Sequence, residues 1–145
     1  MNTLSSRPGE GPPRSLHPLR ALLLAGCVPL FLGVLLSDVA YNGSDQVQWK
    51  NFASWMNAGA LVLCGFALLW ALVGLARADR RRGWTVLSAV LLLVGFVLGF
   101  VNSLLHAKDA AASMSGAAVL SLVVFALLAV ASWLGFSDRR TEVRA

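Results

Sequence analysis

Four long apolar runs dominate this chain and leave few folds open to it. They cover about Ala21 to Ala40, Met56 to Ala76, Thr85 to Leu105 and Ala117 to Phe136. Each is near the roughly 20 residues that a helix needs to cross the hydrocarbon core of a membrane. Because lipid cannot hydrogen-bond to exposed backbone groups, runs of this length without strand-like alternation must be helical. The sequence therefore predicts an all-α integral membrane four-helix bundle.

The composition agrees with a membrane protein and argues against a nucleic-acid partner. Hydrophobic residues make up 57% of the 145 residues and charged residues 13%, which is about half the charged share of a soluble domain. The net charge is +5, but every arginine lies outside the apolar runs and no basic stripe alternates with aromatic residues. We expect one transmembrane domain at 17–136, a disordered cytoplasmic leader at 1–16 and a cytoplasmic tail at 137–145.

Lysine and arginine are distributed unequally between the two sides that four crossings create. Ten arginines fall on one side, and only Lys50 and Lys108 fall on the other. The arginines are Arg7, Arg14 and Arg20 before the first run, Arg77, Arg80, Arg81 and Arg82 between the second and third, and Arg139, Arg140 and Arg144 after the fourth. Because basic residues collect on the cytoplasmic side, the pattern predicts a bacterial inner (cytoplasmic) membrane protein with both termini inside.

Small residues at helical spacing mark the faces on which the helices are expected to pack. In the second run they recur at alternating steps of four and three, and the third run contains a GFVLG motif. In lipid, small residues let helix backbones approach closely, so these stripes predict helix contacts, within the chain or in a homo-oligomer. The predicted packing residues are Gly33, Ala60, Cys64, Ala67, Ala71, Gly74, Gly95 and Gly99.

Polar residues gather at the outer ends of the first three spans, at one predicted membrane level. Ionisable groups near the membrane core are costly unless they are paired inward, which makes such a group a candidate site. The plainer interpretation is hydrated helix ends, with Asp38 and His106 as an interhelical pair. His106 is a candidate proton carrier because histidine ordinarily titrates near physiological pH. The outer polar cluster, as we name it, comprises Asp38, Tyr41, Asn57, Asn102, His106, Lys108 and Asp109.

The cysteines and histidines restrict the cofactors that this chain can hold. Cys27 and Cys64 are expected at different depths, which argues against a disulfide, and no CxxCH motif for covalent haem occurs. His17 and His106 lie at opposite ends of their spans, about 30 Å apart, so this pair cannot ligate one b-type haem. No metal site, nucleotide loop or hydrolase motif is predicted. We therefore predict no cofactor and no catalytic residue, with quinone or b-type haem as the alternative.

Four short motifs carry a resemblance to a known family. They are HPL at His17 to Leu19, SDVAY at Ser37 to Tyr41, QWKNFASW at Gln48 to Trp55 and GFVNSLLHAKDA at Gly99 to Ala110. With them the chain from about His17 to Phe136 resembles bacterial multi-span membrane proteins, a domain of unknown function found in genomes beside sorbosone-dehydrogenase-like quinoproteins. The resemblance implies a four-helix inner-membrane protein that assists a periplasmic oxidation system. Arg20 and Ala111 stand where many relatives carry His and Trp, which weakens a haem or metal site on the inner side.

These observations predict a membrane subunit rather than an autonomous enzyme. We expect a non-catalytic protein that anchors or assists a periplasmic redox partner, either a dehydrogenase of the quinoprotein type or a cytochrome. The rival class is a membrane electron carrier that binds quinone or b-type haem, or a small transporter. Besides the redox partner, the expected partners are the lipid bilayer and further copies of the chain.

Overall fold

The computed structural model describes residues 18–77, 83–107 and 110–137, and within these ranges it contains four helices and no strand. They are α1 (Pro18–Ser44), α2 (Val47–Arg77), α3 (Gly83–His106) and α4 (Ala110–Ser137). Each helix contains a stretch that is long and apolar enough to cross a membrane. The predicted all-α membrane bundle is confirmed. The expected leader at 1–16 and the tail beyond Ser137 lie outside the described residues.

The helices extend beyond the apolar runs from which they were predicted. The difference is largest in α2, which begins at Val47 and has 31 residues, whereas its apolar run begins near Met56. At about 1.5 Å per residue α2 is roughly 46 Å long, against a hydrocarbon core of about 30 Å. Apolarity marks only the part of a helix that lies in lipid, and the helical hydrogen bonds continue into the polar interface. Trp49 and Lys50 therefore belong to α2 rather than to a loop.

A very short turn joins α1 to α2. Asp45 has a φ of 55°, the left-handed conformation that commonly ends a helix and that aspartate tolerates better than most residues. Its amide donates to the carbonyl of Tyr41 at 2.9 Å, and the amide of Trp49 donates to the carbonyl of Gln46 at 3.0 Å. The chain thus reverses within a few residues, so α1 and α2 form an antiparallel hairpin.

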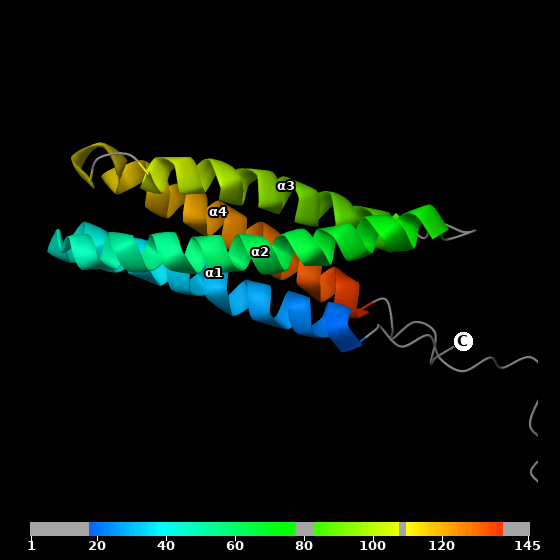
Figure 1. The fold of residues 1–145 in the computed structure, drawn as a ribbon. Helices are drawn as coiled ribbons and strands as arrows, with labels where there is room; N and C mark the ends of the chain where they lie inside the picture. Colours follow the sequence, from blue (N-terminus) through cyan, green and yellow to red (C-terminus); the bar gives the residue numbers. More distant parts are fainter. Residues whose placement is uncertain (1–17, 78–82, 108–109, 138–145) are drawn as a thin grey trace, which may run out of the picture.

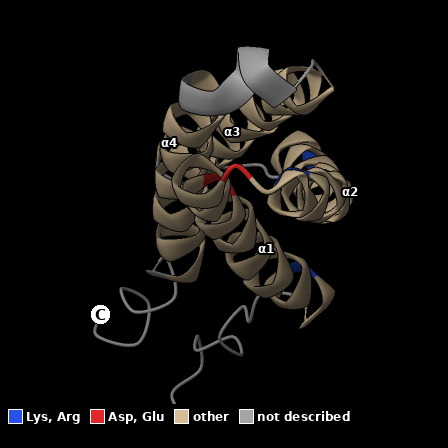
Figure 2. Cartoon of the chain, turned by 90° about the vertical axis from the view of Figure 1, so that its left-hand side faces the viewer, with Lys and Arg blue, Asp and Glu red and all other residues tan. Residues whose placement is uncertain are grey.

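The four helices surround one common axis. The main contacts are α1 with α2, α3 with α4, α1 with α4, and α2 with α3, so each helix has two neighbours. Figure 1 shows α1 starting and α4 ending at the same end of the bundle, which we name the terminal end. The opposite end, where Asp45 lies, is named the turn end. Figure 2 looks at the turn end and shows the four helices arranged about the axis.

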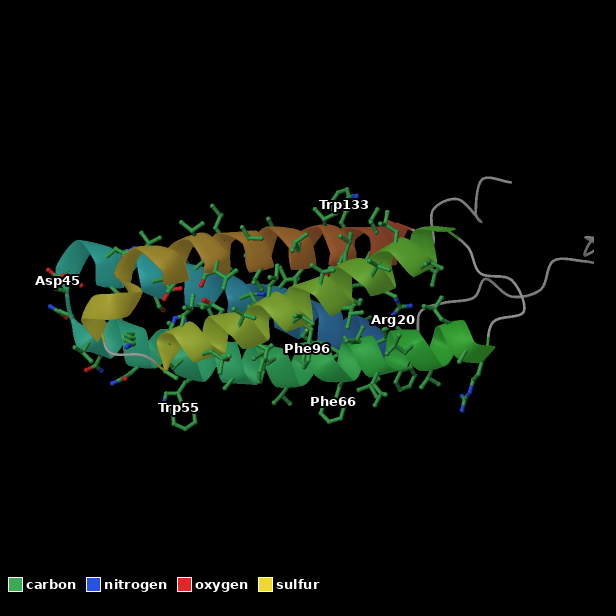
Figure 3. All side chains as sticks on the ribbon, turned by 90° about the horizontal axis from the view of Figure 1, so that it is seen from above. Arg20, Asp45, Trp55, Phe66, Phe96 and Trp133 are labelled. Carbon is green, nitrogen blue, oxygen red and sulfur yellow. The ribbon has the colours of Figure 1, made fainter. Side chains whose placement is uncertain are left out.

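The surface of the bundle is apolar and several polar residues are buried, as expected for a protein in lipid. Trp55 is 81% exposed, Trp133 is 73% exposed and Phe66 is 57% exposed. Figure 3 shows these three side chains directed away from the bundle. The buried polar or charged residues are Ser37, Asp38, Lys50, Asn57, Ser88, Asn102, His106, Ser121 and Ser132.

Most of the predicted packing residues lie at helix contacts. On α2, Ala60, Cys64, Ala67 and Ala71 are all buried in the core. The predicted glycines of α1 and α3 face side chains of other helices, so an added Cβ would meet a neighbour. Such a Cβ on Gly33 would overlap Met56, one on Gly95 would lie 2.7 Å from Leu128, and one on Gly99 would lie 3.1 Å from Leu61 and 3.3 Å from Phe31.

Gly74 is the exception among these residues. It is exposed, and a Cβ built on it would have nothing within 4 Å, so it takes part in no helix contact among the described residues of the chain. A stripe with alternating steps of four and three repeats every 3.5 residues, whereas a straight helix has 3.6 residues per turn. The stripe therefore rotates by about 20° per heptad, and by Gly74 it has left the contact face.

Candidate functional site

The members of the outer polar cluster that the structure describes are buried between the helices near the turn end. Asp38 lies on α1 and is 4% exposed, Asn57 lies on α2 and is fully buried, and Asn102 and His106 lie one turn apart on α3. Tyr41 is buried on α1, about one turn beyond Asp38. Lys108 and Asp109 fall outside the described residues.

Asp38 and His106 form a direct pair between α1 and α3. The His106 Nε2 atom lies 2.8 Å from Oδ1 of Asp38. The other ring nitrogen, Nδ1, lies 2.8 Å from the backbone carbonyl oxygen of Asn102. A carbonyl oxygen can only accept, so Nδ1 must carry a hydrogen and donate it. The orientation of the imidazole is therefore set by α3 itself, which leaves Nε2 directed at the carboxyl group of Asp38.

Two further side chains complete a closed hydrogen-bonded ring. The hydroxyl of Ser121 on α4 donates to Oδ2 of Asp38, and it accepts a hydrogen bond from Nδ2 of Asn102 at 2.8 Å. The ring thus runs from Asn102 through Ser121, Asp38 and His106 back to the Asn102 carbonyl. It joins α1, α3 and α4, and we refer to these four residues as the Asp38 ring.

The donors in the Asp38 ring leave one proton to be shared between Asp38 and His106. Nδ1 and the Ser121 hydroxyl already supply hydrogens to their acceptors, so the contact between Nε2 and Oδ1 needs one further hydrogen. That hydrogen lies on the imidazole, giving an ion pair, or on the carboxyl group, giving two neutral groups. In both forms the pair has no net charge. A proton can therefore move between the two residues without placing a net charge inside the membrane.

Asn57 links α2 to α3 beside the Asp38 ring. Its Nδ2 donates to the Gly99 carbonyl at 3.2 Å and to the hydroxyl of Ser103 at 2.8 Å. Since the Gly99 carbonyl only accepts, the amide must present its nitrogen on that side. All four helices are thereby connected through buried polar side chains near the turn end.

Two acceptor atoms in this region have no hydrogen-bond partner among the described residues. They are Oδ1 of Asn57 and Oδ1 of Asn102, and both atoms are buried. Both amides are held by their nitrogen atoms, so neither can turn its oxygen to a donor without breaking the bonds described above. A buried carbonyl without a donor is costly, so each of these oxygens is a place for a water molecule or for a hydroxyl of a ligand.

Lys50 adds a positive charge near this site. It is 9% exposed on the first turn of α2 and close enough for its ammonium charge to act on His106. In the sequence Lys50 indicates only orientation, and neither Ser103 nor Ser121 belongs to the predicted cluster. An isolated polar residue in an apolar run, such as Ser121 in VLSLVV, was the signal available for the last of these.

The two cysteines lie together, contrary to prediction. Cys27 and Cys64 are equally far along the chain from the α1–α2 turn, so the antiparallel hairpin places them at one depth. Cys27 Sγ lies 3.9 Å from the carbonyl oxygen of Ala60, which precedes Cys64 by about one turn of α2. Both thiols are free in the structure. The apolar run of the second span begins near Met56, which predicts that Cys64 lies closer to the outer end of its helix than Cys27 does. Because α2 begins at Val47, Cys64 is as far from the turn as Cys27.

The described residues contain no group of three or more His, Cys, Asp or Glu side chains placed to hold a metal ion. His106 is the histidine within them, and both of its ring nitrogens are engaged in hydrogen bonds. His17, the other histidine of the haem argument, lies outside them. The Asp38–His106 pair itself is an arrangement that can hold and transfer a proton.

Comparison with protein families gives one match. A family model described as "Predicted membrane protein (DUF2231)" matches residues 16–138, which is most of the chain. A search of curated proteins and a search of solved structures each found no match.

Proposed function

Because the chain belongs to this DUF2231 family of predicted membrane proteins, we propose that it is an inner-membrane subunit that handles a proton for a periplasmic redox partner. In this proposal the termini face the cytoplasm and the turn end faces the periplasm. The chain itself does not catalyse the oxidation. It anchors a partner dehydrogenase or cytochrome and accepts or passes on a proton through Asp38 and His106.

The observation that supports this function most is the shared proton of Asp38 and His106. Oxidation of an organic substrate or of a quinol releases protons together with electrons, so a redox partner needs groups that accept them. Histidine suits the acceptance of a proton because it ordinarily titrates near physiological pH, and a carboxylate beside it stabilises the protonated imidazole. The site lies near the turn end, where a partner on that side of the membrane would dock.

The distribution of charge supports the proposed orientation. Ten of the twelve basic residues of the sequence lie on the side of the terminal end if all four helices cross the membrane. Within the described residues, Arg20 and Arg77 belong to that end, and Asp38 and Asp45 to the other. Figure 3 shows Arg20 and Asp45 at opposite ends of the bundle.

A quinol carrier is the second candidate, and the free carbonyl oxygens of Asn57 and Asn102 favour it. A quinol hydroxyl could donate its hydrogen to either of these oxygens. A b-type haem is less well supported, since both ring nitrogens of His106 are engaged.

Purification of the full chain from its native membranes in a mild detergent separates these functions. The accessory role predicts a colourless, quinone-free preparation in which mass spectrometry identifies a co-purifying periplasmic oxidoreductase. A Soret absorption band or an extractable quinone in stoichiometric amount, without such a partner, would contradict the accessory role and favour the carrier.

A further inference from the structure

A groove opens on the lipid-facing side of the bundle, far from the Asp38 ring. It lies between the first turns of α1 and the last turns of α2 and has a volume of about 550 Å³. Leu19 and Leu23 form one wall, and α2 forms the other with Phe66, Trp70 and further apolar residues. Among the described residues that line it, Arg77 at the end of α2 is the charged one. The groove is thus apolar along its length and basic at its mouth.

The groove exists because α1 and α2 separate toward the terminal end. Figure 1 shows the two helices close together at the turn end and apart at the terminal end. The small residues of α2 that are buried against its neighbouring helices end at Ala71, and a Cβ on Gly74 would have nothing within 4 Å. Gly74 is part of the lining of the groove, so the missing side chain at this position adds to its width.

The length of the groove matches one leaflet of a bilayer. From Phe66 to Arg77, α2 rises by about 16 Å at roughly 1.5 Å per residue. Half of a hydrocarbon core of about 30 Å is about 15 Å. An acyl chain that enters beside Arg77 can therefore follow the groove from the headgroup level to the middle of the membrane.

The charge at the mouth selects among lipids. Arg77 is exposed in the last turn of α2, where a guanidinium group can make two parallel hydrogen bonds to a phosphate. Among the described charged residues, the acidic ones, Asp38 and Asp45, belong to the turn end, so they do not oppose an anion at the terminal end. Basic residues at the membrane surface favour anionic lipids by electrostatic attraction.

We propose that the α1–α2 groove binds an anionic phospholipid, with one acyl chain along Leu23, Trp70 and Gly74 and the phosphate on Arg77. The site is independent of the proposed proton-handling function and of which leaflet lies at the terminal end.

Lipid binding to the delipidated full chain, followed by native mass spectrometry, tests the site. Phosphatidylglycerol and phosphatidylcholine with identical acyl chains serve as probes, and ubiquinone serves as a competitor. The wild type is expected to prefer phosphatidylglycerol by about fivefold, the effect of one basic residue at an anionic surface. Arg77→Gln should abolish this preference and Arg77→Lys should keep most of it, because lysine retains the positive charge.

Gly74→Leu tests the apolar part of the site. A leucine side chain would fill the open space beside Gly74, so binding of both lipids should weaken about tenfold, as expected when a ligand group loses its pocket. Gly116→Leu is the matched control, since Gly116 on α4 also has nothing within 4 Å of its Cβ position. This control should bind like the wild type.

Three results would overturn the proposal. They are equal affinity of the wild type for the two lipids, unchanged binding in Gly74→Leu, and displacement of the phospholipid by an equimolar amount of ubiquinone. The last result would assign the groove to a quinone. Circular dichroism of each variant shows whether it has kept its helices, so a loss of binding can be separated from a loss of fold.

Discussion

Asp38 and His106 differ from other buried polar residues of the bundle in that they can exchange a proton. Ser121 and the Asn102 carbonyl hold them in place, so the geometry of the pair does not depend on solvent. Asp38, Asn102 and His106 are predictable from the sequence because ionisable or amide groups in a span are costly. The bonds between them are not, since these depend on how α1, α3 and α4 are rotated about their axes.

Substitutions at His106 separate a structural role from a proton-carrying one. Glutamine at this position can still donate to Asp38 but cannot carry a proton at neutral pH, so His106→Gln should insert and fold but lose the activity of the redox partner. His106→Ala should lose activity and also about 1 to 2 kcal/mol of stability, the value of a buried interhelical hydrogen bond. Partner activity in membranes and thermal unfolding in detergent measure the two effects.

Leu36→Ala is the control for these variants, because Leu36 is 60% exposed and faces lipid. It should leave both partner activity and the unfolding temperature near the wild-type values. Full activity in both His106→Gln and Asp38→Asn would show that the pair is only a structural link.

At the scale of the elements, small residues determine where the helices touch. Gly95 lets α4 approach α3 through Leu128, and the alanines and Cys64 of α2 let α1 come close. The sequence predicted this stripe up to Ala71 from its spacing alone. The spacing does not show that the contact face of α2 ends before Gly74. That depends on how far the stripe has rotated about the axis of α2 relative to the neighbouring helix.

Gly95→Ala should weaken the contact of α3 with α4. The added Cβ would lie 2.7 Å from a carbon of Leu128, which is itself fully buried and cannot move freely. Overpacking of this kind costs about 1 to 3 kcal/mol. The loss should appear as a lower unfolding temperature in detergent, and the double variant Gly95→Ala/Leu128→Ala should lose less than the sum of the two single variants. Gly116→Ala, in open space, should have no comparable effect; an equal loss there would refute the packing argument.

Cys27 and Cys64 report on the register of α1 against α2. Because the antiparallel hairpin places both cysteines at one depth, with Cys27 Sγ against the turn of α2 that leads to Cys64, a membrane-permeant oxidant should join them in an intramolecular disulfide. Mass spectrometry should detect the loss of two hydrogens and of both alkylation sites. Cys64→Ser is the control and should give no such product. A chain that keeps two alkylatable thiols after oxidation would contradict the observed register.

At the scale of the whole molecule, the four helices place both described ends of the chain on one side of the membrane. We propose that this side is the cytoplasm, because basic residues collect there. The two ends of the bundle then have different roles. In the proposed orientation the polar site faces the periplasm, and the lipid groove, with Arg77, opens toward the cytoplasmic leaflet.

Reporter fusions check this orientation. A reporter that is active only in the periplasm should be active when inserted at Asp45 and inactive when fused after Ala145, because positive charge retains the terminal end inside. A reporter active only in the cytoplasm should give the opposite pattern. The proposed arrangement has three crossings between these positions, α2, α3 and α4. If both positions reported the same side, the number of crossings between them would be even, which would contradict this arrangement.

The sequence by itself determined the fold class, the number of spans and most of the small-residue stripe on α2. These follow from local properties, since lipid forces any apolar run of this length into a helix and a stripe is a matter of spacing within one helix. Only the tertiary structure decided which polar groups meet. Ser121 and Asp38 are 83 residues apart, and His106 and Asp38 are 68 apart. Contacts over such separations depend on the register and rotation of antiparallel helices, which the length and composition of each run leave open.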